Sequence, residues 1–194
     1  GKDLTDEFAT SGEGVAIPGE VAGLLTALEK YGTMTRAQAI QPSLDLEKSG
    51  ITVTASFANL LKKHKYRLEQ FQSSRDTWFN DQGNLYQKGD KWHNPGFAKT
   101  LMLIAKKGME GFYTGELANA IVHATNNSGG ILSLEDLSGY SVKIRKPIRG
   151  NYRGYDILAA PPSASGATVI ELLQILDNFD MAEYEFQSAE RWHF

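Results

Sequence analysis

The chain has 194 residues, of which 41% are hydrophobic, and its formal net charge is −3 at pH 7. This composition is that of an ordinary folded protein and excludes a disordered chain, and the weakly negative charge provides no basic footprint for a nucleic acid. The absence of cysteine excludes disulfides, thiolate metal sites and cysteine nucleophiles within the chain. No run of about 18 apolar residues occurs, so no membrane span is predicted.

The first predicted elements are a lead-in and a helix. Residues 1–16 are glycine-rich and polar, and we expect them to be extended or poorly ordered. Pro18 suits the first turn of a helix, where its missing N–H costs nothing, and Gly32 suits the end of one. Between them apolar residues recur on one helix face, namely Val21, Leu24, Leu25, Leu28 and Tyr31.

A capping pattern marks the next helix. Thr35 and Gln38 have the spacing of a capping box. The helix that they open should bend or restart near Pro42, because proline removes a helical hydrogen bond.

A longer helix is then predicted from about residue 54 to residue 76, with its apolar side chains on one face. The basic run at residues 62–67 lies on this helix and is interpreted as its solvated face. His64 is interpreted as a packed histidine, because no second metal ligand follows three or four residues later.

Shorter elements follow. Helices are predicted over residues 97–108 and 117–125, and Ser133 with Asp136 should cap a short helical turn. We expect residues 142–144 and 152–158 to form strands.

The two strands should form a hairpin or a bulged pair, because residues between them break the segment. Pro147 cannot donate to a ladder, and Gly150 with Asn151 is typical of a turn.

A strand, a loop and a helix are predicted over residues 155–177. Pro161 and Pro162 stop the strand, and residues 163–166 are small and polar. This loop could offer free N–H groups to an anion, but it has the spacing neither of a phosphate-binding loop nor of a nucleophile elbow. We interpret it as a packed turn with a capping serine or threonine.

Apolar residues recur at helical spacing after this loop, at Val169, Leu172, Leu173 and Leu176. We expect Leu172 and Leu173 to face the core. Another helix begins near residue 188, and we expect the polypeptide to continue beyond Phe194 in the intact protein.

The fold class predicted from these elements is α+β, predominantly helical with a small antiparallel β element. The predicted organisation is a lead-in at 1–16, a mainly helical part at 17–140, strands within 141–162 and helices at 163–194 that continue past the end of the chain.

No group of residues has the spacing of a catalytic or metal site. His64, His93, His123 and His193 are far apart in the chain. The adjacent acids Glu135 and Asp136 are interpreted as helix-capping residues, because acids are favoured at a helix N-terminus. We therefore predict no catalytic, substrate-binding or metal-binding residue within the chain and no cofactor.

Several segments nevertheless resemble one enzyme family, the γ-glutamyltransferases, also called glutathione hydrolases. Residues 161–166 are similar to its Pro-Pro-Ser-Ser-Gly-Gly loop, although Ala164 replaces the second serine and Ser165 the first glycine. A positive φ at Ser165 would cost about 1 kcal/mol or more. Further matches, which make the resemblance cover nearly the whole chain, lie at residues 17–23, 29–34, 41–50, 112–115, 129–140 and 149–155.

The resemblance implies a section of the large subunit of an N-terminal-nucleophile hydrolase with αββα layers. In this family the precursor cleaves itself and exposes a threonine, which attacks the γ-glutamyl carbonyl of glutathione or a related amide. The acyl group then passes to water, an amino acid or a peptide. That threonine belongs to the light subunit, which we expect as the partner, and the arginine that holds the substrate carboxylate precedes the matched region.

No catalytic role is therefore transferred to this chain, which we expect to be inactive alone. Members of this family are usually exported, so the resemblance implies a periplasmic or secreted protein. Two alternatives stay open: a related acylase or poly-γ-glutamate depolymerase on the same scaffold, and a helical binding module without catalysis.

Overall fold

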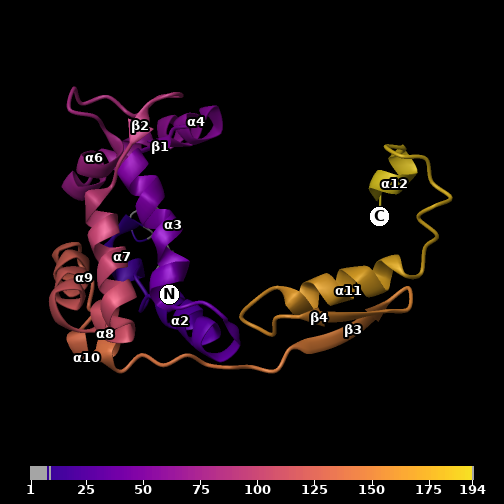
Figure 1. The fold of residues 1–194 in the computed structure, drawn as a ribbon. Coiled ribbons are helices and arrows are strands. Elements are labelled where there is room, and N and C mark those ends of the chain that lie inside the picture. Colours follow the sequence, from indigo (N-terminus) through magenta and orange to yellow (C-terminus); the bar gives the residue numbers. More distant parts are fainter. Residues whose placement is uncertain (1–7, 9, 194) are drawn as a thin grey trace. The chain divides into compact units, whose positions relative to one another are not determined.

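The computed structural model describes residue 8 and residues 10–193 (Figure 1). They divide into two compact units, residues 1–142 and residues 143–194. The elements of the first unit are η1 Gly12–Gly14, α2 Glu20–Tyr31, α3 Arg36–Ser49, β1 Ile51–Thr52, α4 Ala55–Lys63, α5 Lys65–Leu68, α6 Gln72–Trp78, β2 Lys91–Trp92, α7 Pro95–Lys107, α8 Met109–Tyr113, α9 Gly115–Asn127 and α10 Leu134–Ser138. Those of the second are β3 Ile148–Tyr152, β4 Tyr155–Ala159, α11 Gly166–Leu176 and α12 Ala189–His193.

No helix of the described residues has the length and apolar character that a membrane crossing requires. The expectation for residues 1–16 falls largely outside the described residues. Where the structure describes this segment, it is not simply extended, because Gly12–Gly14 form a 3-10 turn capped by Ser11. The N–H of Gly12 donates to the carbonyl of Ser128 (2.7 Å), which holds this turn against the end of α9.

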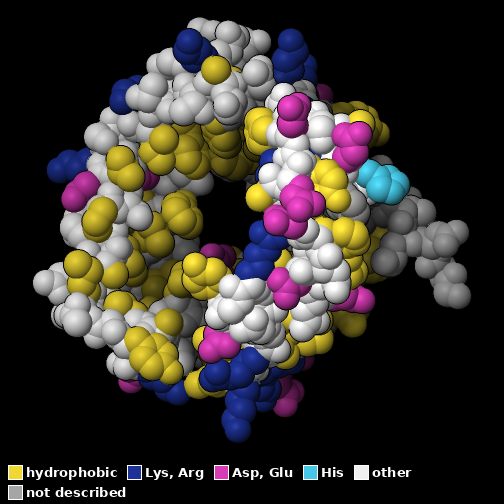
Figure 2. All heavy atoms as spheres, turned by 90° about the vertical axis from the view of Figure 1, so that its right-hand side faces the viewer, with side chains coloured by type: hydrophobic (Ala, Val, Ile, Leu, Met, Phe, Trp, Pro, Cys, Tyr) yellow, Lys and Arg dark blue, Asp and Glu magenta, His cyan; other side chains and the backbone are white. Residues whose placement is uncertain are grey.

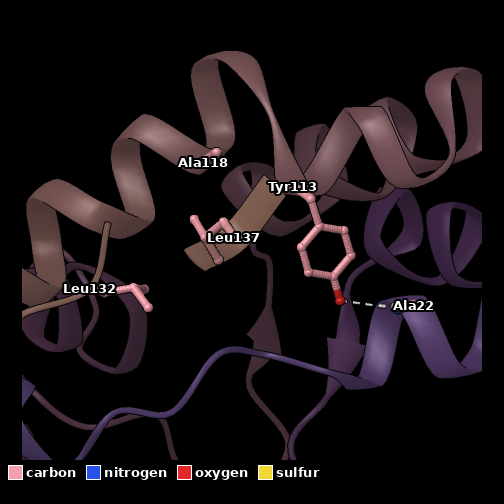
Figure 3. Close-up of a cluster of buried hydrophobic side chains, with 5 residues drawn as sticks. All are labelled: Ala22, Tyr113, Ala118, Leu132 and Leu137. Carbon is pink, nitrogen blue, oxygen red and sulfur yellow. Dashed lines mark hydrogen bonds between the residues drawn. The ribbon is translucent and has the colours of Figure 1, made fainter. Parts of the chain in front are cut away.

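The first unit is organised around a cluster of buried residues, most of which lie on four helices. Its members are Ala22 on α2, Tyr113 on α8, Ala118 on α9, Leu137 on α10 and Leu132 in the segment before α10. Figure 3 shows these side chains converging from segments that are far apart in the sequence. Leu137 has no exposed surface, so the short helix α10 is held by a fully buried anchor.

Helices α2 and α3 follow the predicted patterns with two corrections. Helix α2 begins at Glu20 with Gly19 as its N-cap, so Pro18 precedes the cap and is not in the first turn. Thr35 and Gln38 form the predicted capping box. A bend or a restart was predicted near Pro42; the helix does not restart there, because α3 runs continuously through this residue. A helix can lose one hydrogen bond while the bonds on either side of the proline persist.

The single helix predicted over residues 54–76 is also wrong. The chain is divided into α4, α5 and α6, with a break at His64 and another before Gln72. Thr54 caps α4 by accepting from the N–H of Phe57 (3.2 Å). The rings of Phe57, Trp78 and Trp92 then pack together, with the two indoles stacked at 4.9 Å. This packing returns α6 toward α4, which a straight helix would prevent.

The β-hairpin of the second unit is displaced from its predicted position. Residues 142–144 are not a strand; β3 is Ile148–Tyr152, paired antiparallel with β4 Tyr155–Ala159. Gly150 and Asn151, expected to break the segment, lie inside β3. The turn is instead Arg153–Gly154, both with positive φ (49° and 82°), as a two-residue hairpin turn that matches strand twist requires.

Helix α11 packs on this hairpin. The close approach of the helix to β3 depends on Gly150. A Cβ on Gly150 would lie 2.5 Å from Cγ2 of Ile170, so only glycine lets the helix approach. Ile170 and Gly166 are the two buried residues of α11. Leu173 is half-buried, but the expectation for Leu172 is wrong, since 54% of its surface is exposed.

Candidate functional site

The loop at residues 161–166 is a tight turn that joins β4 to α11. The N–H of Ala164 donates to the carbonyl of Pro161 (3.0 Å), and Arg145 Nη1 donates to the carbonyl of Pro162 (2.5 Å). Gly166 is buried, and a Cβ there would overlap the carbonyl oxygen of Ala160. The second glycine of the family motif is thus needed for close packing of strand and helix.

The two departures from the family motif are tolerated here. Ser165 has φ −83° and ψ 16°, so serine in place of glycine causes no left-handed strain. Ser165 occupies the N-cap position of α11 but its side chain makes no capping bond, so the predicted capping role of this loop is wrong. Ala164 is exposed.

The four histidines lie in different segments of the chain. His64 ends α4, His93 contacts the carbonyl of Glu47 through Nδ1 (2.8 Å), and His123 contacts Asn127 within α9. His193 ends α12 in the second unit. In the described part of the chain no three His, Cys, Asp or Glu residues are grouped so that they could hold a metal ion.

The acids Glu135 and Asp136 have the structural role predicted for them. The N–H of Ser133 donates to Asp136 Oδ2 (2.9 Å), and the N–H of Asp136 donates to Ser133 Oγ (3.1 Å). This completes a capping box at the start of α10. Hydrogen bonds from the Ser133 side chain and backbone lower the pKa of the Asp136 carboxyl. Glu135 lies in the same first turn, where the helix dipole favours acids.

Three of the segments that carry the family resemblance meet at Tyr113, which Figure 3 shows. Its hydroxyl donates to the carbonyl of Pro18 (2.6 Å) and accepts from the N–H of Ala22 (3.1 Å). Its ring stacks on Tyr140 at 5.7 Å, and the space for the Tyr140 hydroxyl exists only because Gly19 has no Cβ. One tyrosine thus fixes three matched segments, 17–23, 112–115 and 129–140.

The Tyr113 hydroxyl is a structural group and not a candidate acid or base. Burial, opposed by its hydrogen bond from Ala22 and aided by nearby Tyr140, raises the pKa of Tyr113. A phenol that stays neutral near neutral pH and has both hydrogen bonds used by backbone has no capacity left for a substrate.

An apolar pocket of about 340 Å³ lies between α2, α3 and α7. Its lining comprises Val21, Leu24, Leu25, Leu28, Arg36, Ala39, Ile40, Leu101 and Ile104. Arg36 is the only charged residue of this lining, and none of the lining residues is a nucleophile or a base. The pocket can accept an apolar side chain but can catalyse nothing.

A family model described as gamma-glutamyltranspeptidase matches residues 1–194. The chain belongs to this family. A glutathione hydrolase proenzyme of Escherichia coli (strain K12) is 36% identical over 190 residues, which are 97% of this chain and 32% of that protein. An acylase ACY 1 proenzyme of Pseudomonas sp. (strain V22) is 32% identical and covers 99% of the chain and 35% of its own length. The chain therefore spans about a third of the curated relatives it matches.

The fold agrees with the family. The crystal structure of the Helicobacter pylori γ-glutamyltranspeptidase superposes with a TM-score of 0.88 at 36% identity, over 93% of this chain and 52% of that one. The predicted class, predominantly helical with a small antiparallel β element and belonging to an N-terminal-nucleophile hydrolase, is confirmed. Within the matched segments Gly19, Tyr113, Tyr140 and Gly166 have packing roles.

Proposed function

We propose that this chain is a section of the large-subunit scaffold of a glutathione hydrolase. The whole enzyme cleaves γ-glutamyl amide bonds, as in glutathione and its conjugates, and transfers the γ-glutamyl group to water, an amino acid or a peptide. The match of the family model across all 194 residues carries this proposal.

The internal arrangement of the chain supports a scaffold role. Its motif residues are used in packing: Tyr113 joins α8 to the entry of α2, and Gly166 lets α11 approach β4. Residues selected for packing need no exposed reacting atom, whereas acyl transfer needs a nucleophile, a base and oxyanion donors in one place. The scaffold therefore supports an active site whose reacting groups belong to other parts of a larger protein.

The surface of the chain supports a larger assembly. Figure 2 shows hydrophobic side chains over much of the visible face. Val169, Leu172, Ile175, Leu158 and Phe97 are among the large apolar residues at least 46% exposed. Such surface is typical of protein that is covered by other protein.

The proposed partner is the light subunit of the same precursor. The relatives are named proenzymes, which supports activation by cleavage. In the proposed mechanism the new terminal threonine of the light subunit attacks the γ-glutamyl carbonyl, and its own α-amine acts as the base. This chain contributes none of these atoms, and it needs no cofactor for them.

The test compares the full-length protein that contains this chain with the 194-residue chain alone. We expect the full-length protein to cleave itself and then to release p-nitroaniline from γ-glutamyl-p-nitroanilide, while the 194-residue chain releases none above buffer. A glutaryl anilide, which lacks the α-amino group, serves as the control substrate and should be poor. Turnover of the glutaryl anilide alone would indicate an acylase and contradict the proposal.

We propose a periplasmic or secreted location for the intact protein. The family resemblance supports it, and a chain without cysteine is compatible with an oxidising compartment. Fractionation of the host organism with an antibody against this chain tests it; the signal should follow the periplasmic or culture fraction.

A further inference from the structure

A groove in the first unit has no part in the proposed function. Its volume is about 610 Å³, within the range of small-molecule sites. Its lining residues come from α4 and α5 on one side and from the loop before β2 on the other. The lining comprises Ala55, Ala58, Asn59, Lys62, Lys65, Gly83, Asn84, Leu85, Tyr86, Gln87 and Lys88.

The two walls are held in place by the fold. The N–H of Val53, just before α4, donates to the carbonyl of Asp90, and the N–H of Gly89 donates back to Val53, both at 2.9 Å. These bonds tie the end of the loop to the start of the helix. The stacked indoles of Trp78 and Trp92, with Phe57 against the first, brace the base of α4. The groove is therefore preformed and requires no closure around a ligand.

The lining carries positive charge without acids. Lys62, Lys65 and Lys88 line the groove, and no Asp or Glu does. Lys65 pairs with Glu69 at 3.3 Å, and both side chains are about half exposed, so this pair neutralises little of the charge. Within the described residues Lys62 and Lys88 form no ion pair.

The lysines of the basic run 62–67 are exposed, as interpreted from the sequence. Lys62 and Lys65 also line the groove together with Lys88, whereas Lys63 does not. Three lysines that border one groove give it a local positive charge, although the net charge of the chain is −3. A bound anion offsets that charge, and the amides of Asn59, Asn84 and Gln87 offer further hydrogen-bond donors there.

We propose that this groove binds a small ligand carrying two or more anionic groups, either carboxylates or phosphates. Lysine suits both, because its ammonium is a point charge that imposes no planar geometry. Ala55, Ala58 and Tyr86 provide an uncharged stretch of lining for the body of the ligand between its charged ends.

The test uses the full-length protein and isothermal titration calorimetry with citrate and, separately, with pyrophosphate. We expect saturable one-to-one binding of at least one of them, which also identifies carboxylate or phosphate as the preferred group. Affinity should fall steeply between 50 and 300 mM NaCl, because the attraction is electrostatic. The proposal fails if neither anion binds saturably below 10 mM.

Variants distinguish anion binding in this groove from nonspecific attraction of anions to exposed lysines. The triple change Lys62→Gln, Lys65→Gln and Lys88→Gln should weaken binding at least tenfold. The matched control is Lys63→Gln, on the same helix but outside the lining, which should change affinity less than twofold. All four lysines are exposed, so the variants should fold, and thermal unfolding checks that they do. Equal weakening by Lys62→Gln and Lys63→Gln overturns the proposal. Release of p-nitroaniline is measured in parallel and tests the glutathione hydrolase activity independently.

Discussion

The two units of the chain differ in how completely each buries its own apolar residues. In residues 10–142 four helices close over a cluster that includes the fully buried Leu137. Among the described residues from 143 onward, only Gly166 and Ile170 are buried, and the opposite side of α11 exposes Val169, Leu172 and Ile175. A two-stranded hairpin with one helix buries little area. The first unit thus stabilises itself, whereas the second needs further protein to cover α11.

The sharpest test of the first unit is Leu137→Ala. It removes a side chain with no exposed surface and should lower the free energy of unfolding by about 2–5 kcal/mol. Urea denaturation of the chain measures this change. The matched control, Leu134→Ala on the same helix α10, removes a residue that is 45% exposed and should cost under about 1 kcal/mol. Equal costs would show that α10 is not anchored as described.

The second unit is tested by a pair of substitutions on opposite sides of α11. Ile170→Ala should destabilise the chain by about 2 kcal/mol, because Ile170 packs against Gly150. Leu172→Ala should change stability by no more than about 0.5 kcal/mol in the chain alone, because its side chain is exposed. In the full-length protein Leu172→Ala should become clearly destabilising. If its effect stays small there, nothing covers this face of α11.

The hydroxyl of Tyr113 is tested by Tyr113→Phe. The change leaves the N–H of Ala22 and the carbonyl of Pro18 without this partner and should cost about 1–3 kcal/mol. The control is Tyr66→Phe, whose side chain is exposed and should be neutral. Chemical denaturation near pH 7 measures both.

The same tyrosine should make stability depend on alkaline pH. Its folded pKa is raised above the ordinary value of 10.0, so its contribution is fully present below pH 10 and is lost as the pH rises from there through the folded pKa. The slope can reach about 1.4 kcal/mol per pH unit for one proton. The stability difference between wild type and Tyr113→Phe should therefore shrink above pH 10, and a constant difference would contradict this account.

The smallest effect is expected from Asp136→Asn at the start of α10. The carboxylate has a lowered folded pKa, so its contribution is present above its ordinary pKa of 3.8 and is lost as the pH falls below that value. Wild type should melt slightly higher than the variant at pH 7, and the difference should shrink as the pH falls below 3.8 toward the lowered folded pKa. Glu135→Gln, outside the capping box, controls for the loss of one charge. A difference that does not shrink on acidification would show that it arises from side-chain shape and not from the carboxylate charge.

Local signals in the sequence were sufficient where the interaction itself is local. The capping boxes at Thr35 and Ser133 were predicted because a side chain bonds a backbone group only three residues away. The lysine groove was missed, because Lys88 lies more than twenty residues after Lys62 and Lys65 and no periodicity connects them.

What the sequence alone determined is the family, the helical content and the caps, because motif order and short-range hydrogen bonding do not depend on distant contacts. Only the tertiary structure decided where the hairpin lies and which side of α11 is buried. Gly150 and Asn151 have the composition of a turn, yet Gly150 lies in β3 because Ile170 needs the space of its missing Cβ. Turn propensity is worth tenths of a kcal/mol to about 1 kcal/mol, and the burial of one large apolar side chain, worth about 2 kcal/mol, outweighs it.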